Sequence, residues 1–426
     1  MVRFRCLPLI WISFLTALVS AAQAPSAGES TRAVTLEECK EIALRHSPDL
    51  ASASAALRAA RGAARLARGL SNPTLEVGRD DFGGQSPSIE RAPLESIGLS
   101  QTVRLGGKRR AEAEAADSAR AAAEEEYRRR RLDLLAEVER EFARWLGAQA
   151  SERIAAENLD TARAVREAVL SLVEAGEASA IEAVKAQNEM DLAEIDLRGA
   201  ERERTLARER LARVLGMDAA GLGSAAGELP ERAEVPDEAA VLSAVEGLPD
   251  LGRWREEARR LEATVDRARR EAIPDPTFSF GVKRYTVTRE RAYFASVSIP
   301  LPLLNRNRGG VIEASARLDQ GRMEWRAEEL RLRTSASAAR SALRSSAAEV
   351  EALRDRILPN AERVYAAVHE GYRRGKFRLL DLLEARRSLA ALRLRFVDAR
   401  IRLSLAKTDL DRLTGAQDAA SEETEP

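Results

Sequence analysis

The spacing of apolar positions predicts long α-helices over most of the chain. Residues 108–176 contain no proline, and their apolar residues recur every three or four positions. About 67 residues of unbroken helix would form a rod of roughly 100 Å at 1.5 Å per residue. Such a rod is much longer than the helices of ordinary globular domains. The clearest part of its apolar stripe consists of Leu132, Leu135, Val138, Phe142 and Trp145.

Two shorter stretches alternate between apolar and polar residues, which is the period of a β-strand. Leu75 and Val77 belong to the first, and Ile97 and Leu99 share one side of the second. A loop rich in glycine and proline separates them, so we expect residues 73–104 to form a strand pair. Strands of about ten residues are long enough to cross a bilayer in a tilted barrel.

Two short helices are predicted before this strand pair. Thr35 and Glu38 have the spacing of a capping box for a helix over residues 36–46. Ser47-Pro48 then opens a second helix that runs to about residue 70, where Asn72-Pro73 ends it.

The same order of segments returns about 199 residues later, so the chain contains an internal duplication. Asp275-Pro276-Thr277 matches Asn72-Pro73-Thr74, and the closing Arg412-Leu413-Thr414-Gly415 matches Arg213-Val214-Leu215-Gly216. We divide the chain into a signal peptide (1–24), a first repeat (25–216) with the strand pair 73–104, a linker (217–236), a second repeat (237–415) with the strand pair 275–300, and a polar C-terminal tail (416–426).

Each repeat has one glycine-centred break between two long helical patterns. The breaks lie near Gly176 and Gly375, and an acidic residue follows six positions later in both, Glu182 and Asp381. Glycine at a helix end is typical of a turn that needs a positive φ. We therefore expect each break to be the tip of a long helical hairpin.

The last predicted helix has the strongest packing pattern of the chain. Its apolar residues follow the three-four spacing of a coiled-coil seam. Pro359 lies in the helix before it, where a proline is expected to end or kink the helix. The seam consists of Leu389, Leu392, Phe396, Ala399, Leu403, Ala406, Leu410 and Leu413.

Composition and charge agree with long helices and argue against several classes of function. Charged residues make up 32 % of the chain and aromatic residues 4 %, and 68 basic residues balance 68 acidic ones. Net charge therefore gives no reason to expect nucleic acid as a partner. Residues 1–24 combine Arg3 and Arg5 with an apolar run and small residues, as in a secretory signal peptide.

Motifs of catalysis or metal binding are missing from the sequence. His46, His369 and Cys39 are isolated, and there is no nucleophile elbow, phosphate loop or dinucleotide fingerprint. We expect neither an enzyme nor a bound metal or cofactor.

The predicted strands constrain the assembly. Four strands are too few to close a membrane barrel, and lipid does not tolerate an open sheet edge. Several chains must then share one barrel, with a ring of helical hairpins below it. The expected fold is mainly α with a membrane β-barrel, built from a duplicated unit of strand pair and long helical hairpin.

The motifs in this order resemble the TolC family of outer-membrane efflux channels. The resemblance covers residues 36–415 and rests on the duplication, on Gly106-Gly107-Lys108-Arg109, on Leu358-Pro359-Asn360, and on Tyr372-Arg373-Arg374-Gly375. It implies a homotrimer in the bacterial outer membrane that forms one twelve-stranded β-barrel, continued by a periplasmic α-helical barrel. It also implies a periplasmic adaptor and an inner-membrane pump as partners. The Pro359 motif and the short chain are more similar to the heavy-metal and drug branch, which works with pumps of the resistance-nodulation-division type.

The resemblance also assigns roles to individual residues. Asp381 and Glu384 match carboxylates that ring the closed periplasmic entrance, and Glu182 and Tyr372 match a pair that ties the two hairpins together. Phe377 stands where the family has an arginine, so another basic residue of the tip would have to replace it. Gly176 and Gly375 match adaptor-docking tips, and Gly106, Gly107, Pro300 and Pro302 mark the transitions from strand to helix.

These residues imply an exit duct that passively conducts small solutes, metal ions or drugs, across the outer membrane. One alternative is the outer-membrane channel of a type I protein secretion system. Another is an exported periplasmic coiled-coil scaffold or adaptor, in which the short strands are surface hairpins. Asp381 and Glu384 also fit solvated positions of an amphipathic helix, and the two tip glycines fit simple turn formers.

Overall fold

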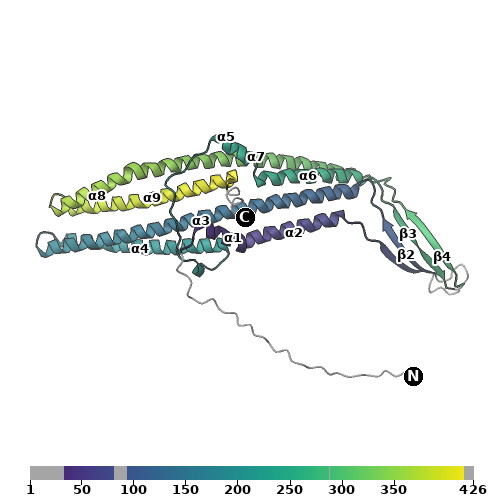
Figure 1. Cartoon of the computed structure of the whole chain (residues 1–426), viewed down its shortest axis with the longest axis horizontal. Helices are drawn as coiled ribbons and strands as arrows, with labels where there is room; N and C mark the ends of the chain where they lie inside the picture. The colour runs from purple at the N-terminus through teal and green to yellow at the C-terminus, as the bar shows by residue number, and fades with distance from the viewer. Residues whose placement is uncertain (1–32, 81–93, 287, 417–426) are drawn as a thin grey trace, which may run out of the picture.

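The computed structural model describes residues 33–80, 94–286 and 288–416. This part of the chain is elongated, with a sheet at one end and helices that extend from it to two hairpin tips at the other end (Figure 1). The predicted signal peptide (1–24), the loop between the first two strands (81–93) and nearly all of the predicted tail (416–426) lie outside the described residues.

One antiparallel sheet contains the strands of both halves of the chain. Its order is β1-β2-β3-β4, so a strand of the first half pairs with a strand of the second half at the centre of the sheet. The outer strands β1 and β4 each pair on one side, which leaves two open edges among the described strands. The strands are β1 (Thr74–Asp80), β2 (Leu94–Thr102), β3 (Thr277–Tyr285) and β4 (Arg291–Ser298).

The first half contains the longest helix, as the stripe of apolar residues predicts. The helix α3 spans 67 residues without a break. The predicted capping box opens α1, because the N–H of Glu38 donates to Oγ1 of Thr35 at 3.3 Å and the N–H of Thr35 donates to the Glu38 carboxylate at 2.9 Å. The helices of this half are α1 (Leu36–His46), α2 (Pro48–Arg68), α3 (Lys108–Glu174) and α4 (Ala180–Leu215).

The second half repeats this plan with one difference. Where the first half has the unbroken α3, the second has α7, a π-helical turn and α8 in succession. The helices are α5 (Glu238–Val245), α6 (Pro249–Arg270), α7 (Arg308–Ala352), α8 (Leu358–Arg373) and α9 (Leu379–Thr414), with the π-helical turn at Leu353–Ile357.

The effect of Pro359 is milder than the sequence suggests. The helix neither ends nor opens into a loop there; it widens into the π-helical turn immediately before, and Pro359 is the second residue of α8. Proline lacks the N–H that an α-helical bond requires, and a π-helical turn shifts the bonding pattern by one residue. The π-helical turn therefore lets the chain remain helical on both sides of the proline.

Each half has its own apolar core, located where its helices run side by side. Trp145, Val138 and Leu211 are among the most buried residues of the first core, and Leu343 and Leu403 of the second. Most of the predicted seam of α9 is inside the protein: Leu389, Ala399, Leu403, Ala406 and Leu410 are buried, and Leu392, Phe396 and Leu413 are partly buried. Burial also raises the pKa of the Cys39 thiol to about 11, so this residue behaves as a small apolar side chain. None of the described helices is both long enough and apolar enough to span a bilayer.

The segment between the two halves runs across several helices. Gln149 of α3 exchanges two hydrogen bonds with the backbone of Ala225, at 2.7 and 3.3 Å. Arg400 of α9 donates to the carbonyl of Leu229 at 3.1 Å, and Arg354 of the π-helical turn donates to that of Glu231 at 3.2 Å. The linker therefore ties the first hairpin to the second near the middle of the molecule.

Candidate functional site

The two hairpin tips have the same backbone geometry. Gly176 has a φ of +75° and Gly375 a φ of +70°, a conformation that other residues rarely adopt. The N–H of Gly176 donates to the carbonyl of Val173 at 3.0 Å, and that of Gly375 to the carbonyl of Tyr372 at 2.9 Å. Apart from the glycine itself and its chain neighbours, no heavy atom lies within 4 Å of the position that a Cβ would take at either glycine. Backbone conformation, and not crowding, explains why both residues are glycine.

Asp381 and Glu384 lie one turn apart at the start of α9. The Asp381 carboxylate accepts a hydrogen bond from the N–H of Arg378 at 3.0 Å, and it lies 3.7 Å from Nε of the same arginine. Asp381 therefore caps the helix, a role the sequence pattern did not reveal. Glu384 is exposed and has no hydrogen-bond partner within the described part of the chain.

Glu182 and Tyr372 come from different hairpins and line the same groove. The groove has a volume of ≈ 1120 Å³ and lies between the end of α3 and the second tip. Burial raises the pKa of Tyr372, and the negative charge of Glu182 raises it further. In the residues that the structure describes, no hydrogen bond joins the two side chains. The structure thus brings the pair close together without a direct bond.

Phe377, at the position where a basic residue was expected, packs against the backbone of Gly371. The ring lies so close that a Cβ on Gly371 would overlap it. Of the basic residues nearby, Arg374 pairs with Glu370 of its own hairpin at 2.7 Å. Phe377 therefore stabilises the tip by apolar packing in place of a charged contact.

An apolar cluster joins the two hairpins next to the tips, on the side toward the sheet. Val165 and Val169 of α3 and Ala186 of α4 pack against Leu382 and Leu383 of α9. All five side chains are buried. Their contact fixes the start of α9 against the first hairpin.

A buried ion pair that the sequence reasoning missed lies next to this cluster. Glu189 of α4 accepts a hydrogen bond from Arg386 of α9 at 2.8 Å, and their side chains are only 7 % and 6 % exposed. Arg387 donates to the same carboxylate from Nε at 2.9 Å. Hydrogen bonding to Arg387, followed by Arg386, holds the pKa of Glu189 below its usual value. One carboxylate of the first hairpin is thus held by two arginines of the second.

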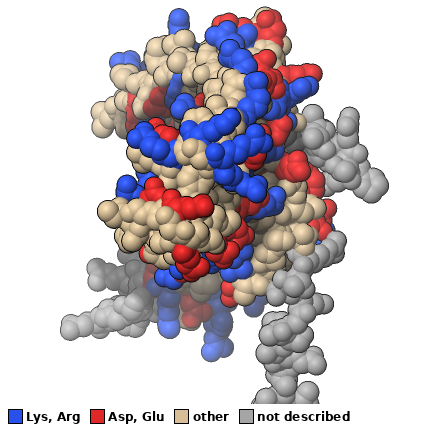
Figure 2. Space-filling model, turned by 90° about the vertical axis from the view of Figure 1, so that its left-hand side faces the viewer, with Lys and Arg blue, Asp and Glu red and all other residues tan. Residues whose placement is uncertain are grey.

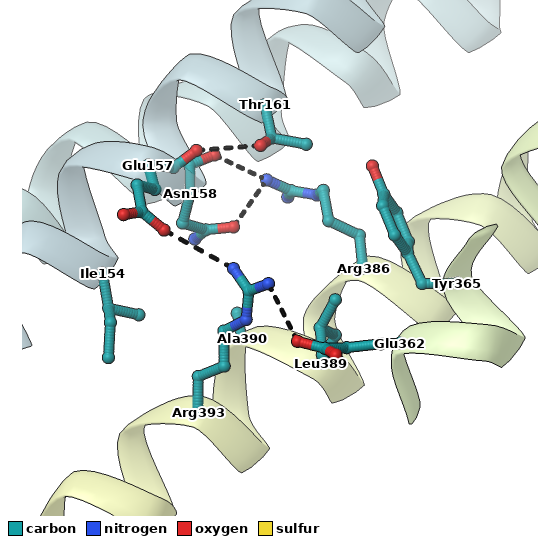
Figure 3. A pocket seen from close by; sticks show the side chains of 10 residues that line it. All are labelled: Ile154, Glu157, Asn158, Thr161, Glu362, Tyr365, Arg386, Leu389, Ala390 and Arg393. Atoms are coloured by element: carbon teal, nitrogen blue, oxygen red, sulfur yellow. Dashed lines mark hydrogen bonds and ion pairs between the residues drawn. The ribbon is translucent and has the colours of Figure 1, made fainter. Parts of the chain in front are cut away.

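The other side of Arg386 binds the first hairpin again. Its Nη1 donates to the carbonyl and to Oδ1 of Asn158 in α3, at 3.3 and 3.1 Å (Figure 3). A second arginine, Arg393, lies 3.5 Å from Glu157 of α3 and 3.2 Å from Glu362 of α8 (Figure 3). These side chains surround a pocket of ≈ 320 Å³ between the hairpins. Polar contacts therefore tie α9 to the first hairpin above the apolar cluster.

The sequence gives little signal for this contact. The apolar seam of α9 continues toward the tip through Ala385 and Leu382, so Arg386 lies next to the seam and not on it. A charged residue beside an apolar seam needs a partner when buried. The pattern alone does not say which acidic residue supplies it, because Glu189 is 197 positions away.

The surface at the tip end carries charges of both signs. Figure 2 shows Lys and Arg side chains beside Asp and Glu side chains over this end of the molecule. The described residues contain no group of three or more His, Cys, Asp or Glu side chains arranged to hold a metal ion.

The transitions from strand to helix are built from residues of both halves. Gly106 and Gly107 have φ values of +69° and +74°, and a Cβ on Gly106 would overlap the side chain of Ile273. Lys108, whose side chain is 4 % exposed, binds Asp275 at 2.9 Å and Glu271 at 3.1 Å. In the second half, Asn307 takes the place of Gly107 with a φ of +58°. Pro300 and Pro302 lie in the irregular segment between β4 and α7.

Comparison with known proteins gives consistent matches over nearly the whole chain. The family model described as "Outer membrane efflux protein" matches residues 41–217 and 242–416. The chain is 29 % identical over 387 residues to the cobalt-zinc-cadmium resistance protein CzcC of Cupriavidus metallidurans, covering 91 % of both chains. It is 27 % identical over 332 residues to the nickel-cobalt-cadmium resistance protein NccC of Alcaligenes xylosoxydans xylosoxydans, covering 76 % of this chain and 73 % of that protein.

A solved structure confirms the fold. The Campylobacter jejuni CmeC outer membrane channel superposes with a TM-score of 0.78 at 15 % identity, covering 91 % of this chain and 89 % of that one. The resemblance that the motifs indicate is therefore confirmed by sequence and by fold. Since the family model matches both halves, the chain belongs to the outer membrane efflux protein family.

Proposed function

We propose that this protein is the outer-membrane exit duct of a tripartite efflux system and conducts small solutes passively. The observation that carries the proposal is the four-stranded sheet with two open edges at the far end of long helical hairpins. An open sheet is unstable in lipid, and further copies of the chain would pair its edges. Membership of the outer membrane efflux family favours this duct over a periplasmic scaffold.

The proposed assembly is a homotrimer. Three chains would contribute their four strands to one twelve-stranded barrel, and the hairpins would form a tube below it. A periplasmic adaptor would dock on the tips at Gly176 and Gly375, and an inner-membrane pump of the resistance-nodulation-division type would deliver the solute. Asp381 and Glu384 would line the closed entrance, with Glu182 and Tyr372 at the contact between hairpins.

Divalent metal ions are the solutes that the comparisons favour. Both curated relatives are named for resistance to such ions, cobalt, zinc and cadmium in one and nickel, cobalt and cadmium in the other. The duct itself needs no metal site for this role, because the pump and adaptor would select the solute. Mixed charge around the tips, with carboxylates at the entrance, suits the passage of cations.

Reconstitution in planar bilayers tests the duct directly. The purified mature protein is expected to form a heat-modifiable trimer and to give stepwise pore conductance. A chain that stays monomeric, washes off membranes in high salt and gives no conductance would contradict the proposal. Loss of zinc and cadmium tolerance on deletion of the gene, restored by the wild-type gene, would test the metal assignment separately.

A further inference from the structure

The register of the sheet places four charged residues side by side in one row across all four strands. Arg79 of β1 is opposite Glu95 of β2, Glu95 is opposite Arg284 of β3, and Arg284 is opposite Arg291 of β4. Because residues in register project from the same face of a sheet, these four side chains share one face. Three positive charges and one negative charge leave a net charge of +2 in the row.

The next two rows on this face are apolar. Two residues along each strand, the next row consists of Val77, Ile97, Val282 and Tyr293, and the row after that of Leu75, Leu99, Phe280 and Ala295. Most of these side chains are exposed, including Val77 at 73 % and Tyr293 at 85 %. The opposite face has small and polar residues such as Gly98, Ser100 and Ser279. In a membrane barrel the apolar face is the one that contacts lipid.

The charged row lies at the end of the sheet that is farthest from the helices. The helices join the sheet at the other end, near Thr74, Thr102 and Ser298 (Figure 1). If the hairpins occupy the periplasm, the row is at the outer rim of the barrel. There the apolar band meets the phosphorylated sugars of the outer-leaflet glycolipid.

Among the described strands, the row contains one acidic side chain for three arginines. None of the three arginines forms an ion pair within residues 33–80, 94–286 and 288–416. Arg284 and Arg291 are directly opposite each other, and like charges in that arrangement repel. Glu95 can offset the charge of Arg284, its neighbour across the strands, but it leaves the charge of Arg291 without an acidic neighbour in the row. An anion between the two guanidinium groups would turn the repulsion into attraction.

The surface between these side chains is hollowed. A groove of ≈ 660 Å³ is lined by all four residues of the row and by Val77, Ile97 and Val282 of the next row. Guanidinium groups therefore line the end of the groove that is farther from the helices, and apolar side chains line the end that is nearer to them. A lipid with an anionic headgroup and acyl chains presents the complementary sequence of groups.

We propose that Arg79, Arg284 and Arg291 form a binding site for the phosphate groups of the outer-leaflet glycolipid, with the apolar rows below them in contact with its acyl chains. The inference rests on the proposed function, because it needs the sheet to lie in the outer membrane. Arginine suits this role, since its planar guanidinium can bind a phosphate through two hydrogen bonds.

The test compares lipid binding by the purified full-length mature protein. Native mass spectrometry would measure the affinity for lipid A that carries two phosphates and for the same lipid after enzymatic dephosphorylation. Wild-type protein is expected to bind the phosphorylated lipid about tenfold more tightly or better. The triple variant Arg79→Gln, Arg284→Gln, Arg291→Gln is expected to lose this preference.

A neighbouring residue supplies the matched control. Lys283 precedes Arg284 on β3, so it has the same kind of charge at nearly the same height but on the opposite face, where its Nζ lies 5.3 Å from the ring centroid of Phe294. Lys283→Gln is expected to leave lipid binding unchanged, whereas Arg284→Gln alone weakens it several-fold. Equal effects of the two single variants would overturn the proposal.

Two further arms make the result decisive. Inorganic phosphate in excess is expected not to displace the lipid; displacement would indicate a site for free anions and would overturn the lipid assignment. Equal affinity of wild-type protein for both lipids would also overturn it, even if the triple variant failed to fold. Pore conductance is measured on the same preparations, so its loss in wild-type protein would count against the duct itself and not against the lipid site.

Discussion

At the scale of single residues, Glu189 is the side chain on which the contact between hairpins depends most. It binds Arg386 and Arg387 of the opposite hairpin in a buried environment. Glu189→Gln would leave Arg386 buried with a neutral partner, and breaking one side of a buried pair costs about 3–5 kcal/mol. Chemical denaturation of the purified protein should show a loss of this order in the free energy of unfolding.

Glu349 offers a matched control for this change. It also binds two arginines of α9, Arg395 at 3.4 Å and Arg402 at 2.9 Å, but it belongs to α7 of the same hairpin and is partly exposed. Glu349→Gln is expected to cost below about 1 kcal/mol, since exposed pairs contribute little. If both variants lose the same free energy of unfolding, the Glu189 contact stabilises the protein no more than the Glu349 contact does.

Titration of Glu189 predicts a pH dependence. Its folded-state pKa lies below the unfolded value because Arg387 and Arg386 stabilise the carboxylate. The resulting stabilisation is fully present above the unfolded pKa of about 4.3 and is lost as the pH falls through the lowered folded pKa. The difference in free energy of unfolding between wild type and Glu189→Gln should therefore be constant near neutral pH and shrink below about pH 4.

A difference that stays the same down to pH 3 would contradict this assignment. Using the difference between the two proteins removes the contribution of other carboxylates that titrate in the same range, such as Glu349.

The prediction for the proposed periplasmic entrance concerns the two carboxylates at the second tip. Asp381→Asn with Glu384→Gln is expected to raise the resting conductance and to weaken block by multivalent cations. The reason is that this double variant lacks the carboxylates that would hold blocking cations in the narrow entrance. Asparagine can still accept the hydrogen bond from Arg378, so the helix cap is retained. Single-channel recording in bilayers, with and without a trivalent cation, measures both effects.

The control for this double variant is Glu370→Gln, which removes a carboxylate from the same tip that is already paired with Arg374. It should leave conductance and block unchanged. If the double variant behaves like this control, Asp381 and Glu384 are solvated positions of α9 with no part in the gate.

At the scale of elements, the sequence predicts what depends on local periodicity and misses what depends on contact partners. The length of α3, the cap of α1 and the strand pairs follow from spacing, proline and capping residues. The π-helical turn before Pro359 does not follow, because the same proline is compatible with a kink, an end or a shift in hydrogen bonding. The capping role of Asp381 does not follow either, because an acidic residue near the start of a helix is compatible both with a cap and with the proposed gate.

The strand-to-helix transition gives a prediction at this scale. Gly106→Ala is expected to destabilise the protein by on the order of 1–2 kcal/mol from the positive φ alone, with more from overlap with Ile273. Gly62→Ala lies in the exposed middle of α2, where an added Cβ would meet nothing within 4 Å beyond the helix's own backbone, and it should instead stabilise by about 0.5–1 kcal/mol. Thermal unfolding of the two variants beside wild type measures both. Opposite signs are expected, and a tolerated Gly106→Ala would argue against a fixed backbone at this transition.

At the scale of the whole molecule, the duplication is visible in the sequence but the way its halves join is not. Periodicity predicts two strand pairs, whereas the pairing of β2 with β3 that fuses them into one sheet is a tertiary fact. The same holds for the linker, whose composition marks it as irregular. Only the structure shows that it spans from Gln149 of α3 to Arg354 of the π-helical turn.

The contacts of the linker have a mechanical consequence. The two halves are fused at the sheet and held together again where the linker binds Gln149 and Arg354, so only the part of each hairpin beyond these residues is free to swing. From Gln149 to the end of α3 this part is roughly 38 Å long, so a rotation of about 8° displaces the tip by roughly 5 Å, about the width of one side chain. A force applied at the tips would therefore act first on the contacts beyond the linker, which include Glu189 and its arginines, while the sheet lies on the other side of the linker.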